Sequence, residues 1–110
     1  MNVQLEAFGN WQVIRVSGQI DSKSVGELRD FIDTELKPSQ PVALELTDVP
    51  FMSSAGLRTL LTLQRKTQDM GVELVLIGVA DVIADTMKVT GFYQFFTIYD
   101  TLQAIPGADL

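Results

Sequence analysis

The sequence contains no cysteine and no histidine. Without them the chain cannot form disulfides, thiol redox centres or metal sites built on thiolate or imidazole ligands. It also lacks the histidine base that activates serine and cysteine nucleophiles in many hydrolases. Chemistry at the surface of this protein must therefore use hydroxyl and carboxylate groups.

Positive charge is scarce as well, since 8 Lys and Arg residues stand against 14 Asp and Glu residues and give a formal net charge of −6. Nucleic-acid binding needs a basic stripe, so we expect no nucleic-acid partner. No stretch approaches the roughly 20 apolar residues that cross a bilayer, and the N-terminal segment lacks the features of a secretory signal. We expect a cytoplasmic monomer with no membrane partner, metal or cofactor.

The residues that are present fit one α/β domain spanning residues 1–110. Apolar residues alternate or form short runs in segments that predict strands, and recur at helical spacing in others. The predicted strands cover residues 3–7, 11–16, 42–46, 73–77 and 95–98, and the predicted helices cover residues 24–36, 56–70, 79–90 and 100–105. This ββαβαβαβα order predicts a mostly parallel mixed sheet with an antiparallel N-terminal edge strand and helices packed on it.

Local signals refine these elements. Ser24 and Glu27 are spaced as a capping box for the first helix, and Asp100 is the expected N-cap of the last. Gly71 and Gly91 are placed to end the second and third helices. The side chains expected to pack in the core or against the sheet include Trp11, Val82, Ile83, Met87, Phe92, Tyr93, Phe95 and Phe96.

The loops at residues 18–24, 47–55 and 77–81 follow strands and should meet at the carboxyl edge of the sheet. One of them leads into the sequence DVPFMSSAGLR at residues 48–58. Gly56 falls in the first turn of a predicted helix, where glycine costs about 0.5–1 kcal/mol relative to alanine. A close approach by a partner backbone or by a phosphoryl group would explain that glycine.

Ser53 and Ser54, at the start of the same helix, allow two interpretations. A serine before an amphipathic helix is commonly only its N-cap. The same place offers unpaired N–H groups and the positive end of the helix dipole, so a phosphate there would be held without unfolding the helix. Phosphorylation adds about −1.5 to −2 charges and would change any interface built over the loop.

The segment Phe51-Met52-Ser53-Ser54-Ala55-Gly56-Leu57 resembles the signature of bacterial anti-sigma factor antagonists, the STAS-domain family. The resemblance continues at residues 18–21, 90–92 and 96–99, so it spans the chain element by element. It implies the STAS fold and places the family's phosphoacceptor serine on Ser54. Ser53 stands where many members carry aspartate, which makes it the second candidate acceptor.

The resemblance also implies which residues bind the partner. These are Asp21, Ser53, Ser54, Ala55 and Gly56. We add Arg58 and Thr59 as partner contacts, because they are expected to be exposed in the first turns after Ser54. From the residues alone, Asp21 is a cap for the following helix and Asp48 is a turn former. Glu45 stands where the family often has aspartate or asparagine.

By this resemblance the protein is a binding switch and not an enzyme. Unphosphorylated, it would bind an anti-sigma factor that is also a serine kinase, and so free a sigma factor. Phosphorylation of Ser54 would release the kinase, and a serine phosphatase would reset the switch. A second interpretation keeps the phosphoswitch but gives it a non-sigma output, such as a secretion or second-messenger enzyme.

Two other classes fit the residues less well. A receiver domain with phosphate on Asp48 would need an acidic pair after the first parallel strand and a lysine near the last strands. A hydrolase with Ser54 as nucleophile would need a Gly-x-Ser-x-Gly turn and a histidine base, and the sequence has neither.

Overall fold

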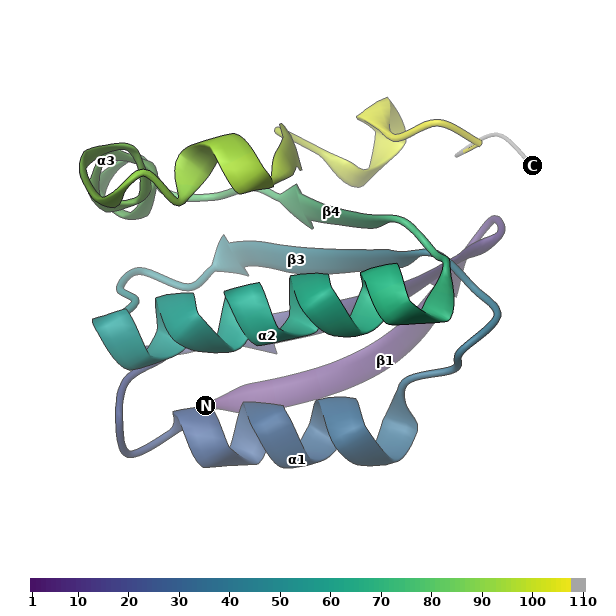
Figure 1. Cartoon of the computed structure of the whole chain (residues 1–110), viewed down its shortest axis with the longest axis horizontal. Helices are drawn as coiled ribbons and strands as arrows, with labels where there is room; N and C mark the ends of the chain where they lie inside the picture. The colour runs from purple at the N-terminus through teal and green to yellow at the C-terminus, as the bar shows by residue number, and fades with distance from the viewer. Residues whose placement is uncertain (108–110) are drawn as a thin grey trace.

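The computed structural model describes residues 1–107 and contains a five-stranded mixed sheet (Figure 1). The strands lie in the order β1 to β5, with β1 antiparallel to β2 and every other neighbouring pair parallel. Along the chain the elements are β1 (Asn2–Phe8), β2 (Trp11–Ser17), α1 (Val25–Glu35), β3 (Val42–Asp48), α2 (Ser54–Met70), β4 (Leu74–Ile77), α3 (Asp81–Thr90), the 3-10 turn η1 (Tyr93–Phe95), β5 (Thr97–Tyr99) and the 3-10 turn η2 (Leu102–Ala104). The predicted mixed sheet with an antiparallel N-terminal edge is confirmed.

The burial of each strand follows its place in the sheet. In β3 the residues Val42 to Leu46 are all buried, because a central parallel strand is covered on both faces. The edge strand β1 instead alternates between half-buried and exposed residues along most of its length. The alternating pattern of β1 therefore indicates an edge strand, and the apolar run of β3 indicates a central strand.

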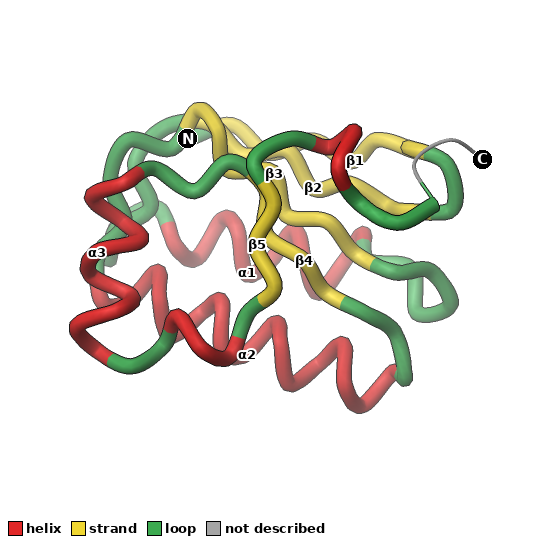
Figure 2. The backbone as a smooth tube through the Cα atoms, turned by 90° about the horizontal axis from the view of Figure 1, so that it is seen from above, coloured by secondary structure: helices red, strands yellow, loops and turns green. Residues whose placement is uncertain are grey.

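The two faces of the sheet are covered in different ways. The helices α1 and α2 lie on one face (Figure 2). The large cluster buried on this face includes Ile14 and Leu44 of the strands, Leu60 of α2, and Ile83 and Met87 of α3. The other face carries a smaller cluster around Trp11, which the C-terminal segment covers with Ile105. Trp11 Nε1 donates to the carbonyl oxygen of Pro106 at 2.8 Å and so ties this segment across the sheet.

The predicted last helix at residues 100–105 is wrong. The chain forms only the three-residue turn η2, and Thr101 rather than Asp100 precedes it. Pro106 cannot continue a helix, so the stretch between Asp100 and Pro106 is too short for a helix of stable length. The segment is held by packing Leu102 and Ile105 against the sheet.

The aromatic segment near the C-terminus also differs from its prediction. Phe95 belongs to η1, and β5 starts only at Thr97. Phe92 and Phe96 are partly buried against the main core, as expected, but the Phe95 side chain is 53% exposed and Tyr93 is exposed as well. A 3-10 turn presents successive residues in different directions, so its aromatic side chains cannot all reach one core.

One residue predicted to face inward from α3 does not. Ile83 and Met87 are buried, but Val82 is 58% exposed. Residues four apart share one side of a helix, whereas Val82 lies about 100° round from Ile83. Gly71 and Gly91 end α2 and α3 in left-handed conformation, as predicted.

Candidate functional site

The loops after β2 and β3 are joined at the carboxyl edge of the sheet. Ile20 and Met52 form a parallel bridge between them. The amide of Ile20 donates to the carbonyl of Phe51 at 3.0 Å, and the amide of Ser53 donates back to the carbonyl of Ile20 at 2.8 Å. These bonds fix the start of α2 against the loop that precedes α1, so the predicted meeting of the two loops is confirmed.

Ser53 and Ser54 have different environments although they are neighbours. Ser53 is the half-buried N-cap of α2, and its Oγ accepts a hydrogen bond from the amide of Gly56 at 3.5 Å. Ser54 is the first residue of the helix and is exposed. The two roles that the sequence left open are thus divided between the serines, with the cap on Ser53 and an accessible hydroxyl on Ser54.

Gly56 is required by the fold of its own chain. It is buried, and a Cβ atom built there would lie 2.5 Å from Cγ of Met52, 2.9 Å from Cγ2 of Ile20 and 3.2 Å from the Ile20 carbonyl oxygen. The expected explanation, a partner backbone or phosphoryl group against this glycine, is therefore wrong. The close approach comes from the bridged loops, and Gly56 lets α2 pack directly on them.

Asp21 organises the turn before α1. Its Oδ1 accepts hydrogen bonds from the amides of Lys23 and Ser24, each at 3.0 Å. The bond from the Ser24 amide, with that from Lys23, lowers the pKa of Asp21 below its ordinary value, because both favour the ionised carboxylate. Asp21 thus holds the turn that leads into α1, but its side chain makes no bond to an amide of the helix itself.

The capping box predicted from Ser24 and Glu27 does not form. Ser24 has helical backbone angles, and its Oγ donates to the carbonyl of Gln19 at 2.8 Å while accepting from the amide of Asp21 at 3.0 Å. The hydroxyl is therefore engaged inside the turn and does not reach the amide of Glu27. No side chain of the described residues caps α1, and the carboxylate of Asp21 instead bonds amides of the turn before the helix.

The other predicted partner-binding residues differ in accessibility. Arg58 is exposed and Ala55 is half-buried. Thr59 was expected to be exposed but is only 6% exposed, and its hydroxyl donates to the carbonyl of Ala55 at 3.1 Å. Thr59 lies three residues after Gly56, on the side of α2 that faces the core.

Phe51 is a surface feature of this site that the sequence did not single out as partner-binding. Its side chain is 47% exposed, while that of the next residue, Met52, is 5% exposed. The signal was available, because an extended pair of apolar residues cannot direct both side chains into one core. Phe51, Ser54 and Arg58 are therefore the exposed residues at the α2 N-terminus, and we call them its outer side.

Glu45 and Asp48 line a different region. Together with Arg15, Thr47 and Asp100 they line part of an open pocket of about 370 Å³ beside η2. Glu45 is buried and its Oε2 lies 2.6 Å from Nη1 of Arg15, while Glu6 bonds the same guanidinium and raises the pKa of Arg15. Glu45 is thus a member of an ion-pair network and not a neighbour in the Ser54 surface.

This fold is shared with solved anti-sigma factor antagonists. A Mycobacterium paratuberculosis anti-sigma factor antagonist is 24% identical, with a TM-score of 0.82 and coverage of 93% of this chain and 87% of that one. The unphosphorylated form of SpoIIAA is 19% identical, with a TM-score of 0.73 and coverage of 94% and 92%. SpoIIAA in its phosphorylated form, described as a Bacillus cell fate determinant, gives a TM-score of 0.66 at 18% identity over 94% and 96%.

The family model described as STAS domain matches residues 2–105. The chain belongs to the STAS-domain family, and the receiver interpretation of Asp48 is therefore wrong. Among curated proteins, the anti-sigma F factor antagonist of Paenibacillus polymyxa is 22% identical over 102 residues, which cover 91% of this chain and 87% of that protein. In the described part of the chain, no helix has the length and apolar character needed to cross a membrane.

Proposed function

We propose that this protein is an anti-sigma factor antagonist controlled by phosphorylation of Ser54. In its unphosphorylated form it binds an anti-sigma factor with serine kinase activity, and the bound kinase transfers phosphate from ATP to Ser54. The phosphorylated protein is released, and a serine phosphatase restores it. The observation that carries the proposal is the exposed hydroxyl of Ser54 at the first residue of α2, within the family signature.

The position of Ser54 suits a phosphate electrostatically. The first turn of a helix has N–H groups without intrahelical partners and the positive end of the helix dipole. In α2 one of these groups, the Gly56 amide, is already bonded to Ser53. A phosphate on Ser54 meets a helix terminus whose cap does not depend on the Ser54 hydroxyl, so modification leaves α2 folded.

The same phosphate opposes a partner that covers the outer side of the α2 N-terminus. Phe51 supplies apolar contact area there and Arg58 supplies a positive charge. A phosphate on Ser54 carries about −1.5 to −2 charges. Beside these two residues it must stay hydrated or find new hydrogen-bond donors on the partner. Screening limits its field to about 10 Å at 0.1 M salt, so the effect is local and does not depend on the net charge of −6.

Ser54 is favoured over Ser53 as the acceptor by accessibility. A kinase must bring the γ-phosphate of ATP into line with the attacking hydroxyl. Ser53 is half-buried, its amide is bonded to Ile20, and its Oγ caps the helix. Phosphorylating Ser53 would require the cap and the adjoining loop to open first.

The experiment that tests this proposal is phosphosite mass spectrometry after incubation with ATP and a candidate anti-sigma factor kinase from the same genome. We expect one phosphate on the wild type and on Ser53→Ala, and none on Ser54→Ala. Phosphate that persists in Ser54→Ala and disappears in Ser53→Ala would identify Ser53 as the acceptor. Failure of every candidate kinase to bind the unmodified protein, measured by calorimetry, would favour the non-sigma output.

A further inference from the structure

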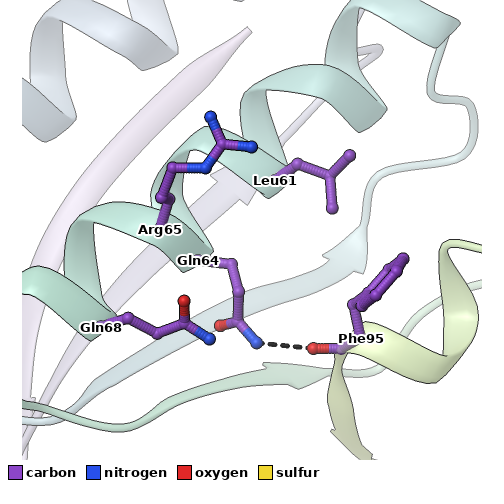
Figure 3. Close-up of a pocket in the computed structure, with 5 residues that line it drawn as sticks. All are labelled: Leu61, Gln64, Arg65, Gln68 and Phe95. Atoms are coloured by element: carbon purple, nitrogen blue, oxygen red, sulfur yellow. Dashed lines mark hydrogen bonds between the residues drawn. The ribbon is translucent and has the colours of Figure 1, made fainter.

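A second surface lies on α2, beyond the residues of the Ser54 site. Between α2 and η1 a groove of about 290 Å³ is lined by Leu61, Gln64, Arg65, Gln68 and Phe95, and we call it the α2 groove. Figure 3 shows Leu61 and the Phe95 ring on its two sides, with Arg65 further along α2 on the side of Leu61 away from Phe95. Its walls thus combine two apolar side chains, a guanidinium group and two amides.

The position of Phe95 is set by its backbone and not by burial of its ring. The side-chain amide of Gln64 donates to the Phe95 carbonyl at 2.5 Å, which fixes η1 against α2. The ring nevertheless remains 53% exposed, whereas the neighbouring Phe92 and Phe96 contribute to the core. A large aromatic side chain held at the edge of a groove is the kind of group that anchors a binding partner.

The charge around this groove is opposite to that of the whole protein. From Ser54 to Gln68, α2 contains Arg58, Arg65 and Lys66 and no acidic residue, although the net charge of the chain is −6. Lys66 is paired with Asp33 of α1 at 3.1 Å. Within residues 1–107, Arg58 and Arg65 form no ion pair, so their charges are available to an incoming group.

A further cation lies against η1. Nζ of Lys88 lies 4.9 Å from the centre of the Tyr93 ring, in the same turn as Phe95. The nearest acidic residue along α2 is Asp69, which follows Gln68 at the C-terminal end of the groove. Of the five residues that line the groove, one carries a positive charge and none is acidic.

We propose that the α2 groove binds a protein segment in which one large apolar side chain is flanked by aspartate or glutamate. The apolar side chain fits between Leu61 and Phe95, its carboxylate neighbours pair with Arg65, and the Gln68 amide and the Oε1 atom of Gln64 bond its backbone. Leu61 lies seven residues beyond Ser54, or about 10 Å along the helix. A partner that covers Ser54 therefore reaches the groove, but this binding does not rest on phosphorylation of Ser54.

The test uses the full chain and synthetic peptides, monitored by amide chemical shifts in two-dimensional NMR. The probe is acetyl-Asp-Glu-Leu-Phe-Glu-Asp-amide, with one control peptide carrying lysine for every acidic residue and another carrying alanine for leucine and phenylalanine. We expect saturable shifts at Leu61, Gln64, Arg65, Gln68 and Phe95, with at least about tenfold weaker binding of both control peptides. Equal binding of the lysine or alanine peptide, or shifts confined to other surfaces, would overturn the proposal.

Variants separate specific binding from general changes in the protein. Phe95→Ser and Arg65→Glu should each weaken the acidic probe at least about fivefold while the thermal midpoint stays close to that of the wild type. The matched controls are Val89→Ser, at an exposed apolar residue of α3, and Arg29→Glu, at an exposed arginine of α1. Both controls should bind as the wild type does, and equal loss in them would refute the assignment.

The same experiment would also detect a second copy of the chain bound in the α2 groove. Shifts at the same residues that grow with protein concentration, without peptide, would mean that a second copy of the chain covers the groove. That result would overturn the proposal of an acidic segment. Because the peptide assay contains no kinase and no ATP, its failure leaves the phosphorylation of Ser54 to be judged separately.

Discussion

The inner and outer sides of the α2 N-terminus differ in what their residues contact. On the inner side Gly56 and Thr59 are buried, with Gly56 against Ile20 and Met52 of the bridged loops. On the outer side Phe51 and Ser54 are exposed. The inner side therefore determines the stability of the domain, while the outer side is free to carry a modification and a partner.

The largest effect on stability is expected from Gly56→Ala. The added Cβ would lie within 3 Å of Met52 and Ile20 side-chain atoms, so we expect the free energy of unfolding to fall by about 1–3 kcal/mol. Urea denaturation measures the change. The matched control is Gly26→Ala in α1, where a Cβ meets nothing within 4 Å and where alanine should be neutral or stabilising by up to about 1 kcal/mol. Equal effects at the two glycines would contradict this assignment of the inner side.

On the outer side, Ser54→Asp tests a residue that should affect partner binding but not the stability of the domain. We expect the affinity for the anti-sigma factor partner, measured by calorimetry, to fall at least about tenfold, or about 1.4 kcal/mol. The thermal midpoint should change little, because an acidic residue is tolerated in the first turn of a helix. Ser39→Asp adds the same charge in an exposed loop before β3 and should bind normally. A similar loss in Ser39→Asp would mean that net charge, and not the local surface, controls the complex.

Ser53→Ala should sharpen the division between the two serines. Its hydroxyl caps α2 through a long bond of 3.5 Å, so we expect a loss of about 0.5–1 kcal/mol in the free energy of unfolding. Ser54→Ala should stay within about 0.5 kcal/mol of the wild type. Chemical denaturation of both variants provides the comparison, and a larger loss in Ser54→Ala would reverse the roles.

The smallest effect is expected at Asp21 and depends on pH. Its pKa is lowered in the folded protein, so its contribution is present at neutral pH and is lost as the pH falls from its unfolded value near 4 through the lower folded value. The stability of the wild type should therefore exceed that of Asp21→Ala at pH 7, and the two should converge in acid. Thermal midpoints from pH 7 down to pH 2 test this, and a constant difference would show that another property of the side chain matters.

Much of the fold follows from local patterns that tertiary contacts do not override. The alternating β1, the apolar run of β3 and the glycine stops of α2 and α3 all lie close to their predicted places. The wrong predictions of secondary structure fall in the short segments after α3. The C-terminal turns were predicted as a longer strand and helix, because their apolar residues are held by the sheet and not by their own periodicity.

For the candidate site, too, some predictions were confirmed and others were wrong. The motif at residues 51–57 placed two serines at a helix N-terminus from sequence alone, and the structure has Ser53 as N-cap and Ser54 as the first helical residue. The exposure of Thr59, the capping role of Ser24 and the reason for Gly56 were all wrong. Each depends on which neighbour lies against the residue, and that neighbour comes from another part of the chain.

By itself the sequence determined the order of elements from β1 to α3, the family signature and the absence of residues for histidine or thiol chemistry, since these properties depend on composition and on near neighbours. Only the tertiary structure decided which serine is accessible, which glycine is enclosed and which aromatic side chains remain exposed. Bridging Ile20 to Met52 fixes the direction in which α2 leaves the sheet. That direction determines which residues of the helix meet the core and which are exposed.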